Sequence, residues 1–182
     1  IKKKAQEVIT FGFAGSNHAL ATAIYANQLG LKSASLLMPQ VNAHYVRRNL
    51  LAGHHYKARL CHYRNLPLLL LGIIWQLCRG KMMLGKFPHV IPAGGSCPLG
   101  IIAYVNAAIE LKEQITAGTL PEPDFIYLSL GSMGTSAGLI LGLKALGLKT
   151  QVIPVRVIEE RMASPVRMLK LIRDTASLLH KF

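Results

Sequence analysis

Two turns rich in glycine and serine carry the residues of this sequence that are best suited to bind an anion. The first reads Gly15-Ser16-Asn17-His18, and the second reads Gly131-Ser132-Met133-Gly134-Thr135. A strand-like apolar run precedes each turn, and an apolar helical run follows it. A helix that starts at such a turn directs unpaired backbone N–H groups and the positive end of its dipole toward one spot, which suits a carboxylate or a phosphate. We therefore expect a site that holds an anionic cofactor and an anionic substrate together.

The elements that position these turns follow an α/β pattern. Strands alternating with helices predict parallel sheets with crossover connections. Ser96 is the expected N-cap of the middle helix, and Gly30 and Gly147 end the other two. Residues 42–88 are less regular and predict a mixture of helices and loops. The predicted strands are 8–13, 33–38, 90–92, 125–130 and 152–158, and the predicted helices are 17–29, 98–116 and 135–146.

The second turn matches neither of the two common phosphate-binding fingerprints. Gly131 and Gly134 lack the third glycine of the dinucleotide motif, and no Gly-Lys-Ser/Thr ending follows as in a P-loop. A short loop of N–H donors remains, together with the hydroxyl groups of Ser132 and Thr135. These donors are sufficient for one phosphate ester on a small cofactor. A glycine-rich turn that serves only as a strand-to-helix connection is the alternative.

Composition favours a globular protein. The chain has 182 residues, of which 51% are hydrophobic and 16% charged, and this excludes a disordered chain. The longest apolar run, residues 66–78, is shorter than the roughly 20 residues that span a bilayer, so no membrane association is expected. The three cysteines are an odd number without metal-ligand spacing, which predicts reduced thiols in a cytoplasmic protein and no metal site.

The net charge of +13 raises the possibility of nucleic-acid binding. The basic residues of the first half are spread over about 40 positions, and no recognised nucleic-acid motif accompanies them. A solvated basic surface, or a surface that faces acidic parts of a larger parent protein, is the alternative explanation. We therefore keep nucleic-acid binding as an alternative and do not expect a nucleic-acid partner.

Three segments carry a resemblance to a known family. The turn at Gly15–His18 resembles the Gly-x-x-Ser-Asn-His/Gln segment of the pyridoxal-phosphate enzymes related to D-cysteine desulfhydrase and 1-aminocyclopropane-1-carboxylate deaminase. Residues 91–100, Ile-Pro-Ala-Gly-Gly-Ser-Cys-Pro-Leu-Gly, are similar to their Pro-x-Gly-Gly-Ser-x-x-Leu-Gly segment, and residues 131–139 to their phosphate-binding loop. The three motifs occur in the family's order. The resemblance implies the tryptophan-synthase β-like fold (fold type II), with a small mobile domain at residues 1–92 and part of a larger cofactor-binding domain at 93–182.

The resemblance also implies roles for individual residues, with pyridoxal 5'-phosphate as the cofactor. Asn17 would donate a hydrogen bond to the cofactor's ring oxygen, and Ser16, Asn17 and His18 would receive the substrate carboxylate. Ser16 would provide the hydroxyl group nearest the reacting carbon. The alternative for His18 is that it serves only as a polar partner of a neighbouring group at the helix start. The Gly94-Gly95-Ser96 turn would approach the cofactor closely. The cofactor phosphate would be held by Gly131, Ser132, Met133, Gly134 and Thr135.

Two parts of the family pattern are absent from this sequence. The lysine that forms the Schiff base with the cofactor would precede Ile1, with Lys2–Lys4 at the end of the helix that follows it. The C-terminal portion of the family would follow Phe182, and Ala19-Leu20 stand where the family usually has an arginine. The resemblance thus implies an internal fragment of a larger enzyme, inactive alone.

The implied activity of the whole enzyme is a lyase or deaminase reaction on a small amino acid. D-cysteine desulfhydration and 1-aminocyclopropane-1-carboxylate deamination are the two candidate reactions, and a homodimer is expected for the whole protein. A non-catalytic anion-binding module and a basic nucleic-acid-binding protein are the alternative functions.

Overall fold

The computed structural model describes residues 5–160 and 162–181. The chain forms two compact units, unit 1 (Ile1–Gly94) and unit 2 (Gly95–Phe182). From the sequence, a division was expected between residues 92 and 93. Lys2–Lys4, expected at the end of a helix, lie outside the described residues.

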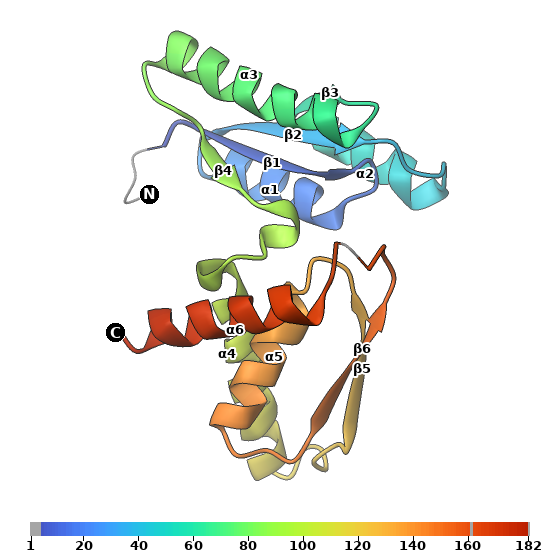
Figure 1. Cartoon of the computed structure of the whole chain (residues 1–182), viewed down its shortest axis with the longest axis vertical. Helices are drawn as coiled ribbons and strands as arrows, with labels where there is room; N and C mark the ends of the chain where they lie inside the picture. The colour runs from blue at the N-terminus through green and yellow to red at the C-terminus, as the bar shows by residue number, and fades with distance from the viewer. Residues whose placement is uncertain (1–4, 161, 182) are drawn as a thin grey trace. The chain divides into compact units, whose positions relative to one another are not determined.

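Unit 1 is a parallel sheet with helices on both faces (Figure 1). Its strand order is β3-β2-β1-β4, and each neighbouring pair is parallel. Helices α1 and α2 cover one face and α3 covers the other. The core contains Ile9, Ala34, Leu36 and Leu69, all at most 1% exposed. The elements are β1 (Glu7–Phe13), α1 (Asn17–Gln28), β2 (Lys32–Met38), α2 (His44–His55), β3 (Arg59–His62), α3 (Leu66–Leu84) and β4 (His89–Ile91).

Helix α3 corrects the interpretation of the apolar run at residues 66–78. The run continues to Leu84 and forms a helix of 19 residues, which by length and composition alone could cross a membrane. Asn65 starts the helix by accepting a hydrogen bond from Leu68 N, and Gly85 ends it in a left-handed conformation. Leu69, Ile73 and Leu77 pack into the core of unit 1. Its inner face is therefore part of the core of unit 1, and its length and apolar composition alone are weak evidence for a membrane span.

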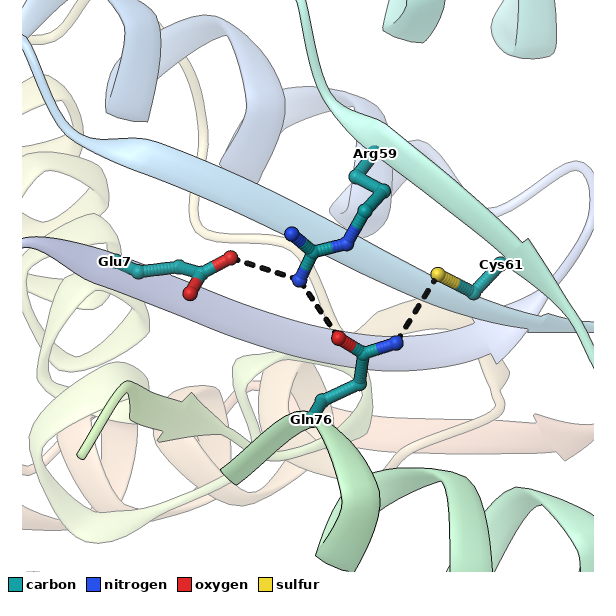
Figure 2. A network of polar contacts seen from close by, with 4 residues as sticks. All are labelled: Glu7, Arg59, Cys61 and Gln76. Carbon is teal, nitrogen blue, oxygen red and sulfur yellow. Dashed lines mark hydrogen bonds and ion pairs between the residues drawn. The ribbon is translucent and has the colours of Figure 1, made fainter. Parts of the chain in front are cut away.

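A partly buried polar network connects α3 to the sheet (Figure 2). The Arg59 guanidinium lies 2.8 Å from the carboxylate of Glu7 and donates to Gln76 Oε1 at 2.7 Å. Gln76 Nε2 in turn donates to Cys61 Sγ at 3.4 Å. Glu7 is 2% exposed and Gln76 is 5% exposed. Because buried polar groups are costly without partners, this network favours one arrangement of α3 on β1 and β3.

Unit 2 contains a two-stranded parallel sheet whose helices lie on one side of it (Figure 1). Its core contains Ala108, Leu143 and Leu148. On β5, Phe125 and Tyr127 are exposed. The short helix η1 (Ala93–Gly95) spans the boundary between the two units in the sequence. The elements of unit 2 are α4 (Pro98–Thr116), β5 (Phe125–Leu130), α5 (Gly134–Ala145), β6 (Gln151–Arg156) and α6 (Pro165–Leu179).

The predicted parallel α/β class is confirmed, but two local expectations are wrong. Residue 97, and not Ser96, is the N-cap of α4: Cys97 has extended backbone angles and makes no side-chain capping bond. Pro98 takes the first helical position, as its fixed φ favours, and this shifts the cap by one residue. Strand β6 ends at Arg156, two residues before the expected end.

Candidate functional site

The start of α5 has the features of an anion-binding site. Strand β5 ends at Leu130, and α5 begins at Gly134 after a short loop. Met133 is the N-cap, adopts the left-handed region with φ 71°, and makes no side-chain capping bond. The N–H groups of the first helical turn therefore lack a capping side chain, and the dipole favours negative charge there. Ser132 and Thr135, which carry hydroxyl groups, flank Met133 and Gly134 in the sequence and are half-buried.

Ser96 also lies at the start of α5. Its Oγ is 2.8 Å from the point that a Cβ on Gly134 would occupy, so no larger residue fits at position 134 without a shift. The hydroxyl groups of Ser96 and Ser136 are buried, and neither has a hydrogen-bond partner among the described residues. Such hydroxyl groups beside an uncapped helix fit a phosphate as ligand.

The glycines of the Gly94-Gly95 turn both have positive φ, 64° and 66°. Residues with a Cβ rarely adopt this conformation, so the turn requires glycine. The carbonyl oxygen of Gly95 accepts from Cys97 N at 2.8 Å. The turn therefore places Ser96 just before α4.

The start of α1 differs from that of α5 because it is capped. Ser16 Oγ accepts a hydrogen bond from Ala19 N at 3.1 Å, as expected of an N-cap serine. The Ser16 hydroxyl proton is not used by this bond and can still be donated. Asn17, the first residue of α1, is exposed. The structure thus brings Ser16, Asn17 and His18 together, with donors from two side chains beside the helix start.

His18 is the titratable group of this turn. Burial lowers the pKa of its imidazole below the ordinary value of 6.5. Its Nε2 atom is buried and has no hydrogen-bond partner among the described residues. A neutral imidazole at pH 7 can present this nitrogen to a ligand as either a donor or an acceptor.

Three residues that the sequence did not identify hold Gly15 in place. Gly15 N donates to Gln40 Oε1 at 2.8 Å, and Gln40 Nε2 donates to Tyr45 Oη at 2.6 Å. On the other side of the residue, Gly15 O accepts from Asn49 Nδ2 at 2.9 Å. A Cβ on Gly15 would lie 2.7 Å from the Tyr45 ring. These partners are 25 to 34 residues away in sequence, so no local pattern could have identified them.

No metal centre is visible in the part of the chain that the structure describes. In residues 5–160 and 162–181, no group of three or more His, Cys, Asp and Glu side chains could hold an ion. The side chains of the two turns offer hydroxyl, amide and imidazole groups beside their backbone N–H donors.

Comparisons with known proteins agree with these features. The sequence profile of the family described as "Pyridoxal-phosphate dependent enzyme" matches residues 1–168. Nocardicin C-9' epimerase from Nocardia uniformis subsp. tsuyamanensis is 34% identical over 183 residues, which is 96% of this chain and 54% of that protein. D-cysteine desulfhydrase from Serratia proteamaculans is 31% identical over 163 residues, 86% of this chain and 48% of that protein.

Solved structures share the fold of this chain. A crystal structure of an ACC deaminase homologue is similar with a TM-score of 0.79 and 30% identity, covering 98% of this chain and 53% of that one. A pyridoxal 5'-phosphate-dependent aspartate racemase shares the fold with a TM-score of 0.62 and 20% identity, covering 85% of this chain and 42% of that one. The chain spans about half the length of the relatives that it matches.

Proposed function

Since the chain belongs to the family of pyridoxal-phosphate-dependent enzymes, whose cofactor is the one expected from the sequence, we propose that the start of α5 binds the phosphate of pyridoxal 5'-phosphate. The observation that carries this proposal concerns Met133, the N-cap of α5. Met133 has a left-handed backbone and makes no side-chain capping bond among the described residues. A non-glycine residue in this region costs of order 1–3 kcal/mol, and such conformations cluster at ligand-binding sites. In this proposal Gly131, Met133 and Gly134 bind through their backbone.

The remaining roles follow the resemblance and stay proposals. In unit 2, Gly95 allows close approach of the cofactor, and Gly94 in unit 1 has the same role. In unit 1, Asn17 donates to the cofactor's ring oxygen. Ser16 and His18, together with Asn17, bind the carboxylate of a small amino acid; this assignment is supported by the free Ser16 proton and the unpartnered His18 Nε2.

The chemistry proposed for the whole protein is bond breaking next to the amino acid's α-carbon. When bound, the cofactor withdraws electrons from that carbon. The residues of this chain hold the carboxylate and the ring oxygen, and Ser16 presents a hydroxyl nearest to the reacting carbon. Elimination of the thiol of D-cysteine and deamination of 1-aminocyclopropane-1-carboxylate are the favoured reactions, because relatives bear these names. In a longer protein that includes the cofactor-binding lysine, Ser16→Ala should depress this activity.

Epimerisation of an amino acid is a second candidate reaction. The observation in its favour is the 34% identity with Nocardicin C-9' epimerase. Epimerisation and elimination can both start with removal of the α-proton, so the same carboxylate-binding residues would serve either reaction. Measuring inversion of the α-carbon separately from release of ammonia distinguishes the two.

Replacement of the two hydroxyl groups at the start of α5 tests the phosphate site. The double variant Ser132→Ala/Thr135→Ala should bind pyridoxal 5'-phosphate more weakly by about 1–3 kcal/mol, because two charge-assisted hydrogen bonds are lost. Fluorescence titration of the chain measures this affinity. Thr116→Ala/Thr119→Ala, at the far end of α4, is the matched control and should leave the affinity unchanged.

Two outcomes of this titration would contradict the proposal. One is equal affinity of the Ser132→Ala/Thr135→Ala variant and the original chain for the cofactor. The other is no cofactor binding combined with tight binding of a DNA duplex that weakens steeply with salt, which would favour the nucleic-acid alternative. Cofactor binding without turnover in a lysine-containing longer protein would favour the non-catalytic module.

A further inference from the structure

Asn49 is a buried side chain in contact with the turn at the start of α1. It lies on α2 and is 4% exposed. Its Nδ2 donates to Gly15 O at 2.9 Å and to Asn17 Oδ1 at 2.8 Å. Its own Oδ1 is buried and has no partner among the described residues.

The partners of Asn49 determine which way both amide groups face. Gly15 O is a carbonyl oxygen and can only accept, so the atom of Asn49 that faces it must be the nitrogen. That nitrogen carries two protons, one for each of its two contacts. The atom of Asn17 at 2.8 Å must then be the acceptor Oδ1. As a result, the two N–H donors of Asn17 remain for other acceptors, and Asn17 is exposed.

The unpartnered Oδ1 of Asn49 supports a role for the donor group. A buried acceptor without a partner is unfavourable, and an apolar side chain of the same size would avoid this cost. What the amide provides at position 49 is therefore its NH₂ group. Gln40 completes the arrangement, because it accepts from Gly15 N at 2.8 Å while Asn49 binds Gly15 O.

We propose that Asn49 is a positioning residue that orients Asn17 as a hydrogen-bond donor toward an acceptor oxygen of the bound ligand. This inference rests on the proposed function, in which that oxygen belongs to the ring of pyridoxal 5'-phosphate. It also predicts a chemical preference: the turn accepts a ligand with an acceptor or anionic oxygen at this point and disfavours a donor. Asn49 acts through Asn17 and does not contact the ligand.

Asn49→Leu tests the orientation directly in the 182-residue chain. The variant removes the donor and keeps the size of the side chain. We expect the side-chain amide signals of Asn17 in a ¹⁵N–¹H spectrum to shift. The affinity for pyridoxal 5'-phosphate should fall by up to about tenfold, the loss expected if Asn17 no longer forms its hydrogen bond to the ligand. Gln76→Leu is the matched control, because it removes another buried amide of unit 1 that has no bond to this turn. It should leave both readouts unchanged.

Further measurements separate the possible failures. Unchanged Asn17 signals in Asn49→Leu would overturn the positioning role. Shifted Asn17 signals in Asn49→Leu, together with full affinity of Asn17→Ala for pyridoxal 5'-phosphate, would preserve the positioning role. They would reject the ligand contact of the proposed function. If Asn49→Leu does not fold, hydrogen exchange of the unchanged chain tests the proposal instead. The side-chain amide protons of Asn49 should exchange at least about tenfold more slowly than those of Asn17, because two acceptors protect them. Equal exchange would overturn the proposal.

Discussion

Ser16 and Met133 occupy the same position, the N-cap, in two similar turns, yet they leave different groups available. Ser16 satisfies one N–H group of α1 with its own hydroxyl oxygen. Met133 provides no such bond, so the first turn of α5 keeps its donors. A helix start with unpaired donors is the better site for a doubly charged phosphate. This difference is the reason for assigning the phosphate to α5 and the carboxylate to α1.

His18 should make the stability of the chain depend on pH. Because burial lowers the pKa of His18 in the folded state, the unfolded chain takes up this proton at a higher pH than the folded chain does. The stability that depends on neutral His18 is present above its ordinary pKa of 6.5 and is lost as the pH falls through the lower folded pKa. When the pH is lowered from about 7.5 to about 5.5, the urea midpoint of unfolding should therefore fall less in His18→Gln than in the original chain.

Urea unfolding at the two pH values measures this effect. His62→Gln is the matched control, since His62 is an exposed histidine at the end of β3. Identical pH dependence in His18→Gln and the original chain would contradict the buried, neutral state of His18.

At the level of elements, three glycines of α5 let it pack closely against α4. Gly134, Gly138 and Gly142 lie one turn apart along the helix. A Cβ at Gly138 would lie 2.7 Å from Ile101 O, and one at Gly142 would lie 2.6 Å from the Ala108 side chain. The close packing places the start of α5 beside Ser96. The glycines thus position the loop proposed to bind the phosphate as well as the core.

Gly138→Ala should destabilise unit 2 by about 1–3 kcal/mol, the usual cost of inserting a methyl group where packing is tight. The contact at Ile101 O is with the backbone, so the two helices must move apart to relieve it. Chemical denaturation measures the loss. Gly131→Ala is the control, because a Cβ at Gly131 meets nothing within 4 Å. Equal stability of the two variants would show that α4 and α5 are not closely packed.

The elements that the sequence predicted well are those with clear start and stop signals. The strands before both turns and helices α1, α4 and α5 match to within one residue, because glycine, proline and capping residues mark their ends. Helix α2 has no such signal: its N-cap, Ala43, makes no side-chain bond. Strand β3 has only four residues, and α3 is apolar on most sides, so neither shows a clear period.

The candidate site was predictable in part. Its local motifs could be identified from the sequence because each turn is continuous in the chain. Gln40 and Asn49 were not identified, because their hydrogen bonds to Gly15 depend on how α1, α2 and β2 pack. Ser96 was identified, but its cap role was wrong, since the proline at position 98 determines where α4 starts.

For the whole molecule, the chain comprises two compact units, each with a turn suited to one anionic group. The relatives that it matches are about twice as long, so the activity and the dimeric state of the complete protein remain proposals. The mobility of unit 1 also remains a prediction. The proposed phosphate site at the start of α5 can be tested on this chain by itself.

An NMR titration of the ¹⁵N-labelled chain with pyridoxal 5'-phosphate tests this central claim most directly. The backbone amide signals of Gly131, Met133 and Gly134 should shift together and saturate with one dissociation constant, because their N–H groups are the proposed phosphate donors. Pyridoxal, which lacks the phosphate, should produce much smaller shifts at these residues. Saturable binding that leaves these three signals in place, or equal shifts with pyridoxal, would contradict the assignment of the phosphate to the start of α5.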